Sequence, residues 1–167
     1  MKRNASITAL FLDVGGVLLT DGWDHHARKR AAKHFKLDRA ELEARHSLNF
    51  DIFEAGKLTL EEYLNRVVFH QKRAFTRSQF RRFMFAQSNP CPQMMALVRK
   101  LKAKYGLKIA AVSNEALELN DYRIRKFKMG EFVDFFISSC YVHVSKPDAD
   151  IMIARSALRS CPAITTA

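Results

Sequence analysis

The sequence has few cysteines and no long apolar run. Its three cysteines, Cys91, Cys140 and Cys161, are widely spaced and form no CxxC pair among the 167 residues. This usage predicts reduced thiols and argues against a disulfide framework or a zinc site. No segment approaches the ~20 consecutive apolar residues of a membrane helix, and no signal peptide is recognisable. We therefore expect a cytoplasmic protein with no membrane partner.

Acidic residues are also scarce relative to basic ones. The chain has 28 Lys and Arg against 17 Asp and Glu, which gives a net charge of +11. Such a charge suits a nucleic-acid partner, and it equally suits the attraction of phosphorylated metabolites. The basic residues fall in blocks such as residues 28–30 and 123–128, on segments with the pattern of amphipathic helices. Because no nucleic-acid-binding motif accompanies them, we expect solvated helix faces and no nucleic-acid partner.

Short apolar runs predict a parallel sheet. Residues 7–12, 107–112 and 133–137 each have the length and composition of a buried strand, and glycines bound the first two. Amphipathic segments between and after these runs alternate with them, as in a doubly wound α/β unit. The helices predicted in this part of the chain cover residues 94–104, 116–129 and 148–158.

The stretch between the first two strands shows helical signals alone. Residues 24–88 contain capping patterns without a strand between them, including capping boxes at Thr59 and Thr76. Helices are predicted after Asp24, Asp38, Thr59 and Thr76, with the second running to Phe53 and Gly56 breaking it. The expected fold is a Rossmann-like α/β core (residues 1–21 and 89–167) with an inserted all-helical cap (residues 22–88).

Polar residues stand just past three predicted strands or their loops: Asp13, Ser113 with Asn114, and Lys146. Ligands of open parallel sheets bind at the carboxyl ends of the strands. There Asp13 can attack phosphorus and form an acyl phosphate. Ser113 can donate a hydrogen bond to a phosphate oxygen, and Lys146 can balance the negative charge.

Glycines after Asp13 add to this prediction. Gly15 and Gly16 let backbone amides approach a phosphate closely. Each feature alone has a simpler interpretation: a turn after a strand, a helix cap at Ser113–Asn114, or a surface lysine before Pro147. The order and spacing of all three favour one site.

These motifs resemble those of the haloacid dehalogenase superfamily, whose members are mostly phosphatases. Residues 11–18 (FLDVGGVL) are similar to its first motif, residues 111–114 (AVSN) to its second and residues 145–148 (SKPD) to its third. Residues 51–59 resemble a segment of the family's small helical cap, of the C1 type. The likeness spans about residues 7–153.

The resemblance implies Mg²⁺-dependent hydrolysis of small phosphorylated metabolites through an aspartyl phosphate, with Asp13, Ser113 and Lys146 as catalytic residues. It also implies that Asp13 and the backbone carbonyl of Gly15 hold the metal. Phosphate or substrate contacts are expected from Gly15, Gly16, Asn114, Trp23 and His25, and His26, Phe53 and Lys57 lie where they could also reach substrate.

Two departures from the family pattern bear on activity. Gly15 stands where the family usually has a second aspartate, which protonates the leaving group and activates water; such a group contributes about 10²–10⁴-fold. The acidic residue of a fourth motif is also missing, since Asp148 and Asp150 are the only acids after Lys146. We expect a C-terminally truncated or frame-shifted chain, an incomplete sheet and weak or absent activity.

Other functions stay open on this sequence. A 2-haloacid dehalogenase needs neither the second aspartate nor a metal. Such dehalogenases, however, carry an aromatic residue where this chain has Gly15. A non-catalytic binding module is a third alternative. The missing strand would lie beside the first strand, and an exposed apolar edge there favours pairing into a homodimer.

Overall fold

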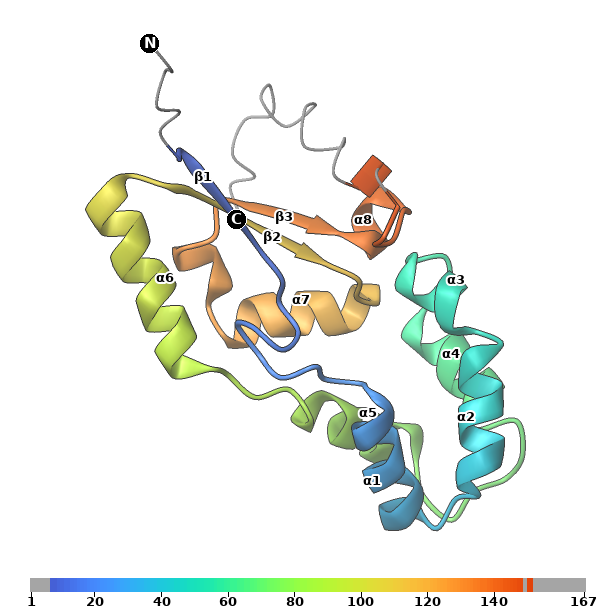
Figure 1. The fold of residues 1–167 in the computed structure, drawn as a ribbon. Coiled ribbons are helices and arrows are strands. Elements are labelled where there is room, and N and C mark those ends of the chain that lie inside the picture. The colour runs from blue at the N-terminus through green and yellow to red at the C-terminus, as the bar shows by residue number, and fades with distance from the viewer. Residues whose placement is uncertain (1–6, 149, 152–167) are drawn as a thin grey trace.

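A small parallel sheet lies at the centre of the computed structural model, which describes residues 7–148 and 150–151 (Figure 1). Its strands β1 (Ala9–Leu12), β2 (Lys108–Ser113) and β3 (Phe135–Ser138) are parallel and lie in the order β1-β2-β3. Leu10 pairs with Ile109, and Ala110 pairs with Phe135. The predicted α/β class, with an incomplete Rossmann-like parallel sheet, is confirmed.

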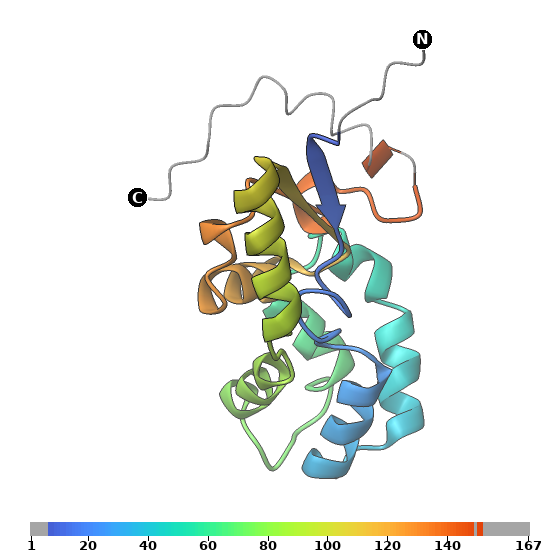
Figure 2. The same cartoon turned by 60° about the vertical axis from the view of Figure 1, so that its left-hand side comes forward.

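Helices α1–α5 follow β1 and gather beyond the end of the sheet to which the strand arrows point (Figures 1 and 2). The inserted helical cap is therefore confirmed, while its exact limits, residues 22 and 88, stay a prediction. The helices are α1 (His25–Phe35), α2 (Arg39–Ser47), α3 (Phe50–Glu54), α4 (Leu60–Val67) and α5 (Arg77–Ala86) in the cap, then α6 (Pro92–Tyr105), α7 (Leu117–Lys126), the 3₁₀ helix η1 (Met129–Glu131) and α8 (Ser139–Val142).

Local capping explains where several helices begin and end. Thr59 accepts from the backbone N–H of Glu62, whose carboxylate accepts from the N–H of Thr59, and Thr76 forms the same reciprocal box with Gln79. These bonds satisfy orphan donors at the first turns of α4 and α5. Gly106 ends α6 in the left-handed conformation that favours glycine. The capping boxes predicted from the sequence are confirmed.

Other predicted boundaries are wrong. The helix expected from Asp38 to Phe53 is interrupted at Asn49, whose side-chain amide donates to the carbonyl oxygen of Arg45 at 2.9 Å. The helix expected to reach Met129 ends at Lys126, and α8 is not predicted at all. The last predicted helix, residues 148–158, lies largely outside the described residues.

The two faces of the sheet have different coverings. Helix α6 packs Met95 and Val98 against the face that carries Ile109 and Ala111. The opposite face carries Phe11, Ala110, Val112, Phe135 and Ile137 and is packed by Val142, Val144 and Ile151. The core is thus completed on one face by α6 and on the other by the segment after β3.

Cap and core meet at the loop after α3. The carbonyl oxygen of Glu54 accepts from Ser139 Oγ at 2.6 Å, and that of Ala55 contacts His143 Nδ1 at 2.7 Å. Gly56 has φ of +68°, and a Cβ atom there would lie 2.5 Å from the carbonyl oxygen of Cys140. Only glycine therefore fits this approach of the cap backbone to α8.

Within the described ranges, 7–148 and 150–151, no helix combines the length and apolar character needed to cross a membrane.

Replacing Gly56 by alanine tests this contact against a matched control. Gly106 has a similar φ of +64°, but a Cβ atom there meets nothing within 4 Å. We expect Gly106→Ala to lower the free energy of unfolding by about 1 kcal/mol, because only the left-handed backbone is penalised. Gly56→Ala should cost a further ~1–3 kcal/mol, because the backbone of α8 must move. Denaturant titration of both variants measures the difference, and equal costs would contradict the close approach.

Candidate functional site

An aspartate and a lysine from opposite ends of the chain meet at the carboxyl edge of the sheet. Asp13 directly follows β1, and Lys146 lies in the loop after α8. Lys146 Nζ lies 2.5 Å from Asp13 Oδ2 and 3.2 Å from the carbonyl oxygen of Val112 in β2. The Lys146 side chain is 33% exposed and that of Asp13 43%, so the ion pair is open to solvent and to a ligand.

Asn114 fixes the loop that carries the lysine. Its Nδ2 donates to the carbonyl oxygen of Lys146 at 3.0 Å, and its Oδ1 accepts from the Lys146 N–H at 2.8 Å. Both ends of the amide are therefore used to hold the Lys146 backbone beside the end of β2. Asn114 was predicted to contact phosphate, and the structure brings it to the site as a support for Lys146.

The remaining predicted residues of the first two motifs lie around this pair. Ser113 ends β2 and is buried, in register with Ser138 of β3. Gly15 and Gly16 form the turn after Asp13, and Gly16 has φ of +69°. The turn is small enough for the Asp21 carboxylate to approach it, since a Cβ atom on either glycine would lie 3.2 Å from Asp21 Oδ1.

A cavity of about 510 Å³ opens between cap and core beside these residues. Its core wall includes Asn114, Glu115 and Asp21, and its cap wall includes Trp23 and Phe53 among others. The predicted contact residues His25 and Trp23 both line it, whereas Lys57 is exposed and does not. The cavity combines an apolar wall with several ionisable side chains.

Trp23 belongs to a buried hydrogen-bonded chain in the cap. Its Nε1 donates to the hydroxyl oxygen of Tyr63 at 2.9 Å, and that oxygen lies 2.8 Å from Nδ1 of His46. An indole N–H can only donate, so the Tyr63 oxygen accepts this bond. Burial, together with the positive charge of Arg28, lowers the pKa of His46 to about 4, although Glu43 opposes the change. This pKa favours the neutral form of His46 at pH 7.

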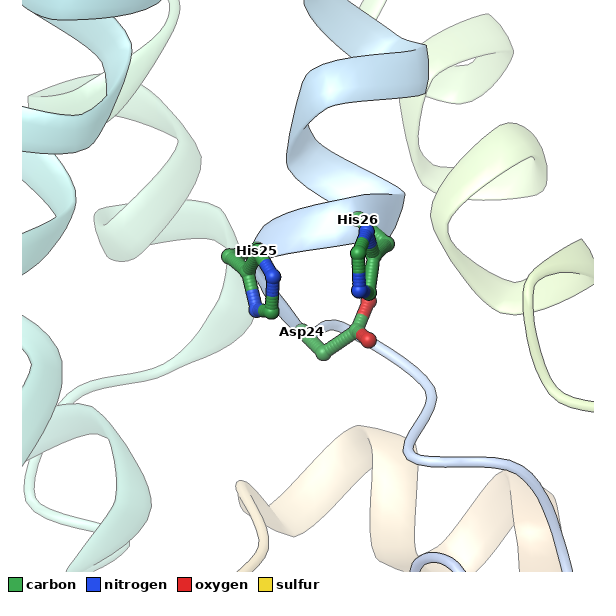
Figure 3. A group of neighbouring side chains, drawn as sticks. All are labelled: Asp24, His25 and His26. Carbon is green, nitrogen blue, oxygen red and sulfur yellow. The ribbon is translucent and has the colours of Figure 1, made fainter.

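His25 and His26 lie at the start of α1 beside Asp24 (Figure 3). Ligand atoms of the three side chains lie within 4.8 Å of one another. Asp24 Oδ1, however, accepts from the Ala27 N–H at 2.7 Å and caps the helix. Both histidines are exposed, and helix capping accounts for the position of the carboxylate.

Burial perturbs two glutamates in the cavity. Burial, together with the negative charges of Glu115 and Asp51, raises the pKa of Glu54 to about 7, although the positive charges of Lys146 and Arg28 oppose the change. Burial also raises the pKa of Glu115, while its ion pair with Arg123 opposes that change. Perturbed carboxyls gathered in one cavity are typical of functional sites.

Arg123 connects the core wall of the cavity to the segment that leads into the cap. Its guanidinium pairs with Glu115 and donates to the carbonyl oxygen of Thr20. The side chain is almost fully buried, and a Cβ atom on Gly22 would contact its guanidinium at 3.4 Å. A charged group held this way fixes the path of the chain between β1 and α1, since removing either partner would leave a buried charge unpaired.

The sequence analysis missed Asp21, Glu54, Glu115, Arg123 and His46 as residues around the site. Glu115 directly follows Ser113–Asn114, so its position beside a motif was a usable signal. The other four approach the site through tertiary packing, and no local pattern announces them.

The fold and motifs define a haloacid dehalogenase-like hydrolase. The sequence profile of that family matches residues 7–155, and the chain therefore belongs to it. The search of curated proteins finds no match.

Solved structures show the same fold at low sequence identity. A HAD family enzyme from Bacteroides thetaiotaomicron is 17% identical over 95% of this chain and 81% of that one, with a TM-score of 0.73. A variant of it, in complex with magnesium and inorganic phosphate, gives a TM-score of 0.74 at 18% identity, over 92% of this chain and 79% of that one. L-2-haloacid dehalogenase from Xanthobacter autotrophicus, with chloropropionic acid covalently bound, gives a TM-score of 0.59 at 15% identity, over 94% of this chain and 66% of that one.

Glu54 should make stability fall with rising pH. Because burial raises its folded-state pKa from 4.5 to about 7, the unfolded chain loses this proton first, and the free energy of unfolding declines between about pH 4.5 and 7. The shift corresponds to roughly 3 kcal/mol at most, and partial solvent contact reduces this to about 1–2 kcal/mol. Glu54→Gln should remove that decline, as measured by denaturant unfolding at pH 5 and 8.

Glu61→Gln is the control, because Glu61 is an exposed cap carboxylate in the first turn of α4. It should unfold with the pH dependence of the wild type. A Glu54→Gln variant that declined as steeply as the wild type would show that this carboxyl is ionised in the folded protein.

Proposed function

We propose that this hydrolase is a Mg²⁺-dependent phosphatase of small phosphorylated metabolites, acting through an aspartyl phosphate on Asp13. The observation that carries the proposal is the 2.5 Å approach of Lys146 Nζ to Asp13 Oδ2 at the carboxyl edge of the sheet. A carboxylate nucleophile and a phosphate are both anions, and a cation between them reduces their repulsion. A cavity large enough for a small metabolite lies beside the pair, and its wall includes Asn114, which holds the Lys146 backbone.

The roles of the other residues follow from their contacts. Asp13 attacks phosphorus, and water then hydrolyses the acyl phosphate. Asn114 keeps Lys146 in place through its two backbone hydrogen bonds. Gly15 and Gly16 let their backbone amides approach a phosphate closely, and Ser113, at the end of β2, donates a hydrogen bond to a phosphate oxygen.

The donor set fits a hard divalent cation. The Asp13 carboxylate is exposed, and with the backbone carbonyl of Gly15 it would hold Mg²⁺, which prefers oxygen ligands and keeps several waters. When bound, the ion would neutralise charge on the phosphoryl oxygens. The magnesium and phosphate bound to the structurally similar variant enzyme support this assignment.

The proposal includes a cytoplasmic location, which the reduced thiol pattern supports. Cys91 and Cys140 are both free, and burial raises the pKa of Cys140 to about 12, so this thiol is not a nucleophile. With glycine at position 15, we expect slow turnover. We propose no nucleic-acid partner, and the position of β1 at the end of the described sheet favours a homodimer.

Dehalogenation of a 2-halo acid is the second candidate, with Asp13 forming an ester with carbon. Its support is the shared fold with L-2-haloacid dehalogenase, at a lower TM-score of 0.59. The Lys146–Asp13 pair would serve either reaction. A non-catalytic binding role is the third candidate, and salt-sensitive binding of nucleic acid would favour it.

Hydrolysis of p-nitrophenyl phosphate, with and without Mg²⁺, tests the proposal. We expect Asp13→Asn to lower kcat/KM on the order of 10³-fold or more, because no acyl phosphate can form. Lys146→Met should lower kcat/KM by about 10²–10³-fold, because Asp13 would then attack without the ammonium group that reduces its repulsion from the phosphate. Chelation of the metal should abolish turnover, and Mg²⁺ should restore it.

Lys100→Met provides the matched control, because Lys100 is exposed on α6, away from the cavity. It should keep wild-type turnover. Chloride release from 2-chloropropionate, measured in parallel and without metal, would instead support dehalogenation. Phosphatase turnover that survives in Asp13→Asn would contradict the proposed nucleophile.

A further inference from the structure

The proposed reaction needs a proton at a place where this chain has no obvious donor. When Asp13 attacks phosphorus, the ester oxygen leaves with a negative charge, and an alkoxide is a poor leaving group unless it is protonated. Position 15, beside the nucleophile, carries no side chain. Lys146 is already engaged with Asp13 and with the carbonyl oxygen of Val112.

Four described carboxylates line the cavity: Asp21, Asp24, Glu54 and Glu115. Glu115 is paired with buried Arg123, and Asp24 caps α1. Glu54 belongs to α3 of the cap, and its backbone is tied to α8. None of these three is held against the turn that follows the nucleophile.

Asp21 lies against this turn. A Cβ atom on Gly15 would lie 3.2 Å from Asp21 Oδ1, and one on Gly16 would lie at the same distance. The Asp21 carboxylate therefore occupies space into which a side chain at position 15 would extend. Its side chain is exposed and makes no hydrogen bond or ion pair among the described residues, so its oxygens are available to a ligand.

We propose that Asp21 is a catalytic carboxylate of this site and replaces the acid that position 15 lacks. In the first step, an Asp13 oxygen bonds to phosphorus, the bond from phosphorus to the ester oxygen breaks, and the Asp21 carboxyl gives that oxygen its proton. In the second step, water attacks phosphorus, Asp21 takes a proton from the water, and the bond from phosphorus to Asp13 breaks. This inference rests on the proposed phosphatase function.

The structure also explains why a glycine suits position 15. Gly15 does not have a positive φ, so its backbone accepts any residue. The constraint is the neighbouring Asp21 oxygen, because a contact of 3.2 Å is tighter than a Cβ atom normally makes. A side chain at position 15 and a carboxylate at position 21 are therefore alternatives for the same space.

Two phosphate esters with different leaving groups test the role of Asp21. p-Nitrophenolate leaves without a proton, whereas the alkoxide of glycerol 2-phosphate needs one. Since kcat/KM reports the steps up to phosphoryl transfer, Asp21→Asn should lower it by about 10²–10⁴-fold for glycerol 2-phosphate and by less than about 10-fold for p-nitrophenyl phosphate. Gly15→Asp combined with Asp21→Ala, which frees the space beside position 15, should recover part of the lost turnover, and Glu61→Gln should match the wild type.

A stability cycle tests the geometry without any turnover. Gly15→Ala should lower the thermal unfolding temperature in the wild type, and it should lower it less in an Asp21→Ala background, where the crowding oxygen is gone. If Gly15→Ala lowers the unfolding temperature equally in both backgrounds, Asp21 does not lie against the turn, and the proposal is overturned with that placement.

The remaining outcomes of the experiment with the two esters also decide whether the proposed role of Asp21 stands. Asp13-dependent turnover of both esters that is unchanged in Asp21→Asn would overturn this inference and leave the proposed function standing. An equal loss on both esters that excess Mg²⁺ reverses would make Asp21 a metal ligand and would also overturn it. If the wild type shows no Asp13-dependent turnover of either ester, the proposed function fails first, and the role of Asp21 fails with it.

Discussion

The ion pair between Lys146 and Asp13 is the contact on which the site depends. It joins the loop after α8 to the end of β1, across 133 residues of sequence. Parallel pairing of β1 with β2 and of β2 with β3 brings both segments to one edge of the sheet. The Asn114 amide then holds the lysine backbone, so that a carboxylate and an ammonium group meet at this edge.

The cap is placed over this pair by contacts that tolerate little change. The loop at Gly56 packs its backbone directly on α8, and the buried guanidinium of Arg123 holds the segment that leads from β1 into the cap. They give the cap a defined position relative to the core, and Glu54 lies in a partly buried environment that favours its protonated form.

Local patterns predicted most of the fold, because the forces behind them are local. Reciprocal capping at Thr59 and Thr76, the left-handed glycine after α6 and the apolar strands all depend on neighbours in the sequence. Asp13 and Lys146 could be placed at one site because parallel strands share an edge. The break at Asn49 was missed because a side-chain hydrogen bond to Arg45 competes with a helical pattern that looks continuous. Asp21 was missed because its approach to Gly15 depends on how the loop folds back, and no residue type or spacing reports that.

The acyl phosphate itself is the most direct test of the account. Rapid acid quench of the enzyme with a phosphate ester and Mg²⁺, followed by peptide mass spectrometry, detects a phosphorylated aspartate. We predict a mass increase of one phosphoryl group on the peptide that contains Asp13, and its absence from Asp13→Asn. A phosphate ester that is hydrolysed while Asp13 stays unmodified, or phosphorylation of another residue, would contradict the central role of the Lys146–Asp13 pair.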